Sequence, residues 1–259
     1  MKQKGQKMDW NLEIDNIANW MREYLESSGC KGYVILTSGG IDSSVVSCLC
    51  CKAVGPENVI AVSLPCETRE DMKNDAVELT NNLGVELKVI DIEETYNTIV
   101  KGLLSVGEID TIALENIKSR LRMVAGYGIA NTENHLLAGT GNLSEDSISF
   151  FTKFGDGGVD ILPLGNYYKT EIYQLAEFMP EIPDSIKTKA PCADLSPDQK
   201  SDEEIFGITY KEIDKILKGL DPDDLQSLEG IDINKIGKIM DMIKKGEHKN
   251  KMPPKCPRL

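Results

Sequence analysis

The chain has 259 residues, of which 29 are Lys or Arg and 42 are Asp or Glu, so its formal net charge is −13. This length fits one large domain or two small ones. We expect one domain over residues 1–259, with an ordered core at 8–250 and a tail at 251–259. The acidic balance argues against nucleic acid and anionic membranes as partners, but not against a small anionic ligand at a local site. We expect the acidic excess on the surface, for instance at 202–204 and 221–224.

The cysteines and the lack of long apolar segments indicate a cytoplasmic protein. Seven cysteines are an odd number, which favours reduced thiols over a disulfide framework. No segment approaches the ~20 apolar residues of a membrane span, and the polar N-terminus lacks the apolar core of a signal peptide. The sequence Cys48-Leu-Cys-Cys51 could suggest a metal site, but its apolar neighbours favour a buried helix instead.

Strands and helices alternate over the first 140 residues. Apolar spacing predicts helices at 9–28, 43–54, 71–83, 92–105 and 110–131, and apolar runs predict strands at 33–37, 59–63, 87–90 and 135–138. In the helix at 110–131, Ile117, Leu121 and Val124 form the expected buried stripe. This alternation implies an α/β fold, a parallel β-sheet with helices on both faces. Glycine-containing loops at 38–42 and 139–142 follow the first and fourth strands, at the sheet edge where ligands bind.

The pattern changes beyond residue 150. The segment 150–158 (FFTKFGDGG) combines aromatic residues, charge and glycine, and predicts a mobile loop. Helices are predicted at 170–179, 210–217 and 231–244, and the polar, proline-interrupted segment 184–208 predicts a long loop. Residues 252–259 form an expected frayed tail.

The most informative motif is SGGIDSS, which lies between the first strand and the next helix. Two glycines let the backbone approach an anion, and helix N–H groups together with serine hydroxyls can then hold phosphate. The Walker A pattern is absent. An ordinary strand-to-helix turn with a Ser or Asp cap is the alternative, which the two consecutive glycines make less favoured. The seven residues are Ser38, Gly39, Gly40, Ile41, Asp42, Ser43 and Ser44.

This loop resembles the SGGxDS pyrophosphate loop of the adenine nucleotide alpha-hydrolase-like enzymes, which split ATP into AMP and pyrophosphate. The downstream motifs, in order and spacing, are similar to those of the NAD synthetase family over about residues 30–220. They are NIKSRLRM at 116–123, GTGNLSE at 139–145, FFTKFGDGGVD at 150–160, PLGNYYKT at 163–170, KAPCAD at 189–194 and QKSDE at 199–203. The resemblance implies a Rossmann-like fold and ATP-dependent amidation of deamido-NAD by ammonia through an adenylated carboxylate.

The resemblance also implies roles for individual residues. Asp42 and Glu145 would bind Mg²⁺, whose preferred ligands are hard oxygens. Besides the loop at 38–44, ATP would contact Thr140, Lys169 and Cys192. Lys169 and Lys189 would stabilise the charge that develops on pyrophosphate, and Asp156 would position or deprotonate ammonia. The residues expected to contact deamido-NAD are Arg120, Lys153, Asp160, His248 and Lys249. Phe150, Phe151 and Phe154 offer stacking surfaces for the nicotinate ring, although simple anchoring of the loop is an equal alternative.

Some positions depart from the family pattern. Cys192 stands where the family usually has Ser or Thr, and a thiol is a poorer hydrogen-bond partner. Gly141-Asn142 replaces the Asp-His of many bacterial relatives. Arg69 either faces the adenylate or caps the next helix.

The resemblance further implies a homodimer, for which the helix at 110–131 is the candidate interface. Because the phosphate loop begins at residue 38, we expect no glutaminase domain, and ammonia that is free or supplied by a separate subunit. Two other functions stay open. One is another amidating or thiolating ATP pyrophosphatase, and the other is a non-catalytic ATP-binding module of the universal-stress type.

Overall fold

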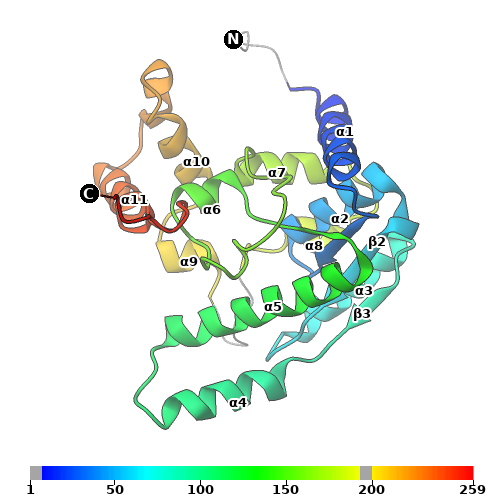
Figure 1. Cartoon of the computed structure of the whole chain (residues 1–259). Coiled ribbons are helices and arrows are strands. Elements are labelled where there is room, and N and C mark those ends of the chain that lie inside the picture. The colour runs from blue at the N-terminus through cyan, green and yellow to red at the C-terminus, as the bar shows by residue number, and fades with distance from the viewer. Residues whose placement is uncertain (1–7, 193–199, 259) are drawn as a thin grey trace.

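The computed structural model describes residues 8–192 and 200–258, and its centre is a four-stranded parallel sheet (Figure 1). The strands are β1 (Tyr33–Leu36), β2 (Val59–Ser63), β3 (Leu87–Val89) and β4 (Leu136–Ala138), in the order β3-β2-β1-β4. Tyr33 on β1 is in register with Val59 on β2 and with Leu136 on β4. Since β1 is apolar and almost wholly buried, it forms the middle of the sheet, and the predicted α/β parallel architecture is confirmed.

Five helices precede or connect these strands. After β3 the chain passes through α4 and α5 and returns to the opposite side of β1, where it enters β4. The strand order therefore reverses between β1 and β4, and the loops that follow these two strands meet at one edge of the sheet. Figure 1 shows α4 and α5 side by side, as an arm at one border of the molecule. The five helices are α1 (Trp10–Ser28), α2 (Ile41–Val54), α3 (Glu70–Leu83), α4 (Glu93–Leu104) and α5 (Thr111–Glu133).

The second half of the described chain is helical. Its helices are α6 (Leu143–Ser147), α7 (Lys169–Ala176), α8 (Asp184–Thr188), α9 (Asp202–Phe206), α10 (Tyr210–Lys218) and α11 (Ile233–Gly246), and short 3₁₀ helices occupy Pro56–Asn58 and Pro222–Leu228. The prediction of one long loop at 184–208 was therefore wrong at both ends. Helix α9 forms because Ser201 and Glu204 make a reciprocal capping box. Residues 193–199, which belong to the same predicted loop, lie outside the described residues.

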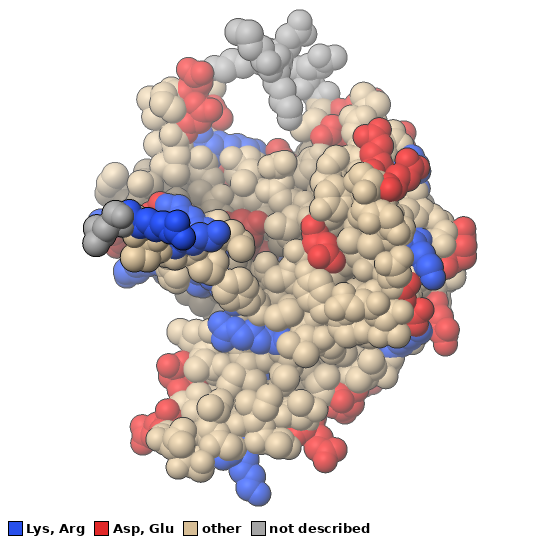
Figure 2. Space-filling model, viewed as in Figure 1, with Lys and Arg blue, Asp and Glu red and all other residues tan. Residues whose placement is uncertain are grey.

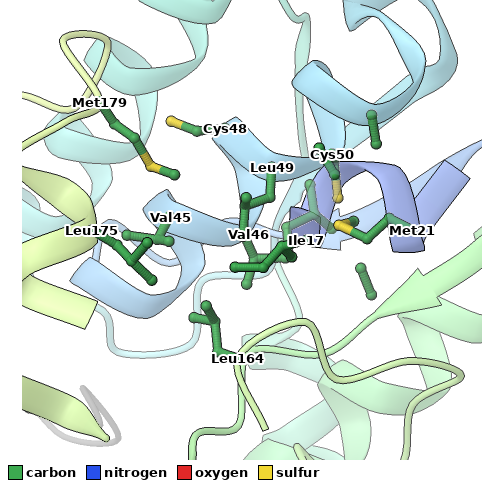
Figure 3. Packing of buried hydrophobic residues seen from close by; sticks show 14 of the residues in the cluster. Ile17, Met21, Val45, Val46, Cys48, Leu49, Cys50, Leu164, Leu175 and Met179 are labelled. Carbon is green, nitrogen blue, oxygen red and sulfur yellow. The ribbon is translucent and has the colours of Figure 1, made fainter. Parts of the chain in front are cut away.

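The main core lies where α1, α2 and α7 pack together against the sheet (Figure 3). Helix α2 is buried around most of its circumference, and Cys48 and Cys50 pack there among aliphatic side chains. Burial raises the pKa of both thiols well above its ordinary value. The interpretation of 48–51 as a buried helix is confirmed, and the described residues contain no group of three side chains suited to hold a metal.

Helix α5 confirms the expected buried stripe only in part. Ile117 and Leu121 are partly buried and pack against the core, but Val124 is exposed, and the fully buried positions are Lys118, Ser119, Gly126 and Ala130. The expectation assumed that apolar side chains would define the inner face. Lys118 can be buried because Glu67, from the loop after β2, pairs with its ammonium group. Glu67 itself has a left-handed backbone, with φ at 55°.

No helix among residues 8–192 and 200–258 combines the length and the apolarity that crossing a membrane requires.

Candidate active site

The loop between β1 and α2 has the form of an anion cradle. Gly39 has a φ of 85°, and a Cβ atom there would lie 2.2 Å from the Met72 carbonyl oxygen, so only glycine fits. Helix α2 begins at Ile41 without a side-chain cap. Its first N–H groups therefore point toward the loop as donors for an anion. The Ser43 and Ser44 hydroxyls donate to the Gly40 carbonyl at 3.0 and 2.8 Å and hold the turn.

Asp42 and Glu145 converge on the ammonium group of Lys169. The Lys169 Nζ lies 2.5 Å from Asp42 Oδ2 and 2.8 Å from Glu145 Oε1. Asp42 comes from the first turn of α2, Glu145 from α6 and Lys169 from the first turn of α7. Asp42, which lies more than a hundred residues before the other two in sequence, therefore meets Glu145 and Lys169 at the edge where β1 and β4 end.

Burial and charge pairing set the pKa values of this cluster. Removal from water raises the pKa of Asp42 to about 6, although Lys169 opposes the shift. Burial alone would lower the pKa of Lys169, but Asp42 and Glu145 outweigh it and raise the pKa above its ordinary value. The ammonium group therefore stays charged and pairs with the carboxyl groups of Asp42 and Glu145.

Buried polar side chains hold α6 and α7 beside this cluster. The Asn142 side chain is inaccessible to water, donates to Asp42 Oδ1 at 3.3 Å and accepts from the Glu145 N–H at 3.0 Å. The Ser144 hydroxyl accepts from the Lys169 N–H at 2.8 Å and donates to Asp214. Asp214 also accepts from the Thr170 N–H at 2.9 Å, so two carboxylate oxygens serve the start of α7.

Asp202 contradicts the expectation that 202–204 belongs to the acidic surface. Its side chain is 3% exposed, and one of its carboxylate oxygens has no hydrogen-bond partner among the described residues. The Tyr210 hydroxyl lies 3.1 Å from both Asp202 Oδ2 and Glu145 Oε1, and so links the two carboxylates. Sequence reasoning assigned no site role to Asp202 or Tyr210, although Asp202 belongs to the QKSDE motif and the capping box starts a helix at residue 202.

Lys189 is held by the start of α3. Its ammonium group pairs with Asp71 at 2.8 Å and with Asp75, and lies 3.4 Å from Met72 Sδ. Burial alone would lower the pKa of Lys189, but the hydrogen bonds with Asp71 and Asp75 raise it. Met72 also contacts Gly39, so a single residue separates Lys189 from the phosphate loop in space.

Helix α5 orders the segment 150–158. The Ser119 hydroxyl donates to Asp156 Oδ1 at 2.6 Å, and Thr152 hydrogen-bonds to Asn116 at 2.6 Å. Asp156 is exposed as a residue, but desolvation of its carboxyl group raises the pKa above its ordinary value. The hydrogen bonds from Ser119 and the Thr152 N–H oppose this shift. Arg120, exposed on the same helix, reaches the Lys153 carbonyl at 3.4 Å.

The two oxygens of the Asp160 carboxylate are both engaged within the protein. Oδ1 accepts from the Tyr127 hydroxyl at 3.0 Å, and Oδ2 accepts from the Leu137 N–H at 2.8 Å. Asp160 therefore ties the chain that follows the 150–158 segment to α5 and β4.

The C-terminal segment and the loop after α6 hold each other through two lysines. Lys249 Nζ donates to the Ser149 and Phe151 carbonyls, both at 2.9 Å. In return, Lys153 Nζ donates to the His248 carbonyl at 2.7 Å and to the Lys251 carbonyl at 2.5 Å. Figure 2 shows the basic side chains of this segment together on one side of a recess in the visible face. The structure brings together four of the expected dinucleotide contacts, which are Arg120, Lys153, His248 and Lys249.

The remaining expected residues are more scattered. Thr140, half-buried, follows β4, and Cys192 lies 3.7 Å from the Lys200 carbonyl. Phe150 packs edge-to-face on Phe206, which favours anchoring of the loop over stacking, whereas Phe154 is 51% exposed. Arg69 stands at the N-cap of α3 without a side-chain capping bond, and its Nε lies 3.5 Å from Asp71.

A pocket opens beside the phosphate loop at the ends of β1 and β2. It is lined by Leu36, Thr37, Ser38, Val62, Ser63, Leu64, Pro65, Thr68, Lys73 and Arg122. The Arg122 guanidinium donates to the Leu64 carbonyl at 3.2 Å and so secures one wall. Apolar walls with a few polar groups suit a planar organic ring, and the neighbouring loop suits a phosphate.

Together, the parallel sheet, the glycine-serine loop at the strand-order reversal and the converging carboxylates define a nucleotide-binding α/β protein of the ATP pyrophosphatase type. The family model of NAD synthase matches residues 13–253, and the chain belongs to this family.

The similarity to named relatives extends over nearly the whole chain. The chain is 40% identical over 249 residues to an NH₃-dependent NAD⁺ synthetase of Archaeoglobus fulgidus, with 95% of this chain and 97% of the relative covered. Among solved structures, an NMN synthetase from Francisella tularensis superposes with a TM-score of 0.87 at 30% identity, covering 96% of this chain and 99% of the other. An NH₃-dependent NAD synthetase from Campylobacter jejuni superposes with a TM-score of 0.83 at 29% identity, covering 96% and 100%.

Proposed function

We propose that this protein is an ammonia-dependent NAD synthetase, which uses ATP to convert the nicotinate carboxylate of deamido-NAD into the amide of NAD. The observation that carries the proposal is the meeting of the glycine-serine loop with Asp42, Glu145 and Lys169 at one sheet edge, in a chain of the NAD synthase family. Ammonia as the nitrogen source is supported by NH₃-dependent relatives that match nearly end to end.

In the first step, a carboxylate oxygen of deamido-NAD attacks the α-phosphorus of ATP, and pyrophosphate leaves. The N–H groups at the start of α2 and the loop at 38–44 hold the phosphates, and the Lys169 ammonium group stabilises the charge on the leaving group. The pocket beside the loop receives the adenine ring. Lys189 supports this end of the site through Met72, which packs on Gly39.

Mg²⁺ fits the carboxylates that face this loop. Asp42 and Glu145 present oxygen atoms to a single point, which Lys169 Nζ now marks, and oxygen is the ligand type that Mg²⁺ requires. When bound, the ion neutralises the negative charge of the phosphates.

In the second step, ammonia attacks the adenylated carbonyl carbon, and AMP leaves. Asp156 accepts a proton from the attacking nitrogen. Ser119 and the Thr152 N–H orient the Asp156 carboxylate, and desolvation raises its pKa, which makes the group a stronger proton acceptor than an ordinary carboxylate. Arg120, Lys153, His248 and Lys249 bind the dinucleotide, and Asp160 positions the adjoining loop through Tyr127 and Leu137.

A second copy of the chain completes the assembly at the arm formed by α4 and α5. Leu104, Val106 and Ile112 are exposed there by 56%, 85% and 70%, and an apolar surface of this kind favours burial against another protein. Sedimentation at increasing protein concentration tests this homodimer, and Val106→Asp is expected to shift it toward the monomer. Cytoplasmic location accords with the free cysteines of the described residues.

The test of the function follows the products of a defined mixture. The protein is incubated with ATP, Mg²⁺, ammonium and deamido-NAD, and NAD, AMP and pyrophosphate are quantified. All three are expected in equal amounts. ADP as the product, or AMP formed at the same rate without deamido-NAD, contradicts the proposal and favours another ATP-using enzyme.

Two further arms refine this test. Nicotinate mononucleotide replaces deamido-NAD in one of them, because the similar F. tularensis structure is an NMN synthetase. Faster amidation of the mononucleotide would change the substrate assignment. In the other arm, Asp42→Ala and Glu145→Ala are expected to abolish turnover without unfolding the protein. Asp15→Ala, which removes an exposed carboxylate on α1, is the control expected to keep full activity.

A further inference from the structure

Lys169 places a positive charge at the point where the proposed metal ligands converge. Its ammonium group lies within 2.8 Å of one oxygen from each of Asp42 and Glu145, and the residue is 2% exposed. It also lies 5.2 Å above the ring of Tyr210. The ammonium group thus makes the contacts with Asp42 and Glu145 that a divalent ion would need.

A divalent ion and this ammonium group cannot share the position. Mg²⁺ binds carboxylate oxygens at about 2.0–2.1 Å, so an ion bound to both carboxylates would lie in contact with Lys169 Nζ. Two cations at such a distance in a buried site repel each other strongly. Binding of the ion therefore requires the lysine side chain to leave.

Hydrogen bonds hold the backbone of Lys169 in place, whereas its long side chain is anchored only at its end, by the two carboxylates and the Tyr210 ring. Ser144 accepts from the Lys169 N–H and Asp214 accepts from the next N–H, so the start of α7 stays in place. The flexible four-carbon side chain can still turn from the carboxylates toward the phosphate loop, because Asp42 belongs to the helix that begins at that loop. A phosphate bound there would offer the ammonium group a new anionic partner.

We propose that Lys169 is an internal counter-ion, which neutralises Asp42 and Glu145 until the metal arrives with ATP and then transfers to the phosphates. This inference rests on the proposed function, since it takes Asp42 and Glu145 as the metal ligands. The counter-ion competes with the metal in the absence of nucleotide and cooperates with it in the presence of nucleotide. The protein therefore binds the metal weakly alone and tightly together with ATP.

The test measures metal binding to the full-length protein without nucleotide and does not depend on turnover. Mn²⁺, a paramagnetic substitute for Mg²⁺, is titrated and the free ion is followed by electron paramagnetic resonance. Lys169→Met removes the competing charge and is expected to tighten Mn²⁺ binding by about tenfold or more. Lys218→Met, which removes an ammonium group from a different ion pair on α10, is the matched control and is expected to bind as the wild type does.

A double variant shows whether the tighter Mn²⁺ binding of Lys169→Met occurs at Asp42 and Glu145. Adding Glu145→Gln to Lys169→Met is expected to remove the tighter binding, because one of the two ligands is lost. If Lys169→Met fails to fold in a thermal melt, Lys169→Gln makes the same comparison with a neutral side chain that can still donate a hydrogen bond.

Unchanged or weaker Mn²⁺ binding by the folded Lys169 variants would overturn the proposed counter-ion role of Lys169. The same holds if the gain survives Glu145→Gln, because the ion would then bind elsewhere. Failure of this inference is distinguishable from failure of the proposed function. In the first case the wild-type protein still forms NAD, AMP and pyrophosphate from deamido-NAD, and in the second case it does not.

Discussion

Gly246, the last residue of α11, marks the point where the C-terminal segment packs on the active-site loop. A Cβ atom on residue 246 would lie 1.9 Å from Ser149 Cβ and 2.2 Å from Ser149 Oγ, which is far inside van der Waals contact. Ser149 cannot retreat easily. Its backbone is left-handed, with φ at 58°, and its N–H donates to the Asp146 carbonyl at 3.1 Å. We therefore predict that Gly246→Ala separates α11 from this loop.

The magnitude follows from two opposing effects. Alanine favours a helix over glycine by about 1 kcal/mol, which would stabilise the variant. Forcing a methyl group into a packed contact costs about 1–3 kcal/mol, and a clash with backbone-linked atoms belongs at the upper end. The free energy of unfolding is therefore expected to fall by about 1–2 kcal/mol. Because Lys249 loses its carbonyl partners at Ser149 and Phe151, the KM for deamido-NAD is expected to rise more than kcat falls.

Gly237→Ala on the same helix is the matched control. Gly237 is exposed, and a Cβ atom there would meet nothing within 4 Å. In this variant alanine favours the helix without causing a clash, so the free energy of unfolding is expected to rise by about 0.5–1 kcal/mol. Urea denaturation of both variants and steady-state kinetics with deamido-NAD measure the difference. If Gly246→Ala is as stable as Gly237→Ala and keeps the wild-type KM, the close packing of α11 on Ser149 is wrong.

Three further predictions concern the site and the core. Gly39→Ala is expected to abolish turnover, measured as AMP release, because the new methyl group would collide with the Met72 carbonyl; wild-type activity would contradict the geometry of the loop. Burial raises the pKa of Asp202 to about 6, so the folded protein retains a proton that the unfolded chain releases, and this contribution to stability is lost as the pH rises from about 4 to above 6. Asp202→Asn should therefore gain up to about 3 kcal/mol of stability relative to the wild type between pH 4 and pH 7, and an unchanged difference in urea denaturation across this range would refute it. In native protein, the exposed Cys256 is expected to react with a thiol reagent such as DTNB, whereas Cys50 should react only after unfolding; rapid labelling of Cys50 in the folded state would contradict its burial.

The amino-acid sequence alone predicted the parallel sheet and the phosphate loop, because both depend on local chemistry. Short apolar runs such as Tyr33–Leu36 form strands wherever they can be covered on both faces. Two glycines followed by polar residues after such a strand indicate a close turn with free N–H donors, and Gly39 indeed adopts a φ that favours glycine. The meeting of Asp42 with Glu145 was also predictable in outline, since both follow ends of parallel strands.

Only the tertiary structure decided which polar side chains lie inside. Nothing in the local sequence distinguishes the buried Lys118 from an exposed helical lysine, because its burial depends on Glu67, which is 51 residues away. Asp202 was expected on the surface and instead lies beside Tyr210 and Glu145. The exchange of contacts between Lys153 and the C-terminal segment joins parts of the chain almost a hundred residues apart. Burying a charged or polar group is favourable only when a partner is supplied, and the fold rather than the local sequence supplies these partners.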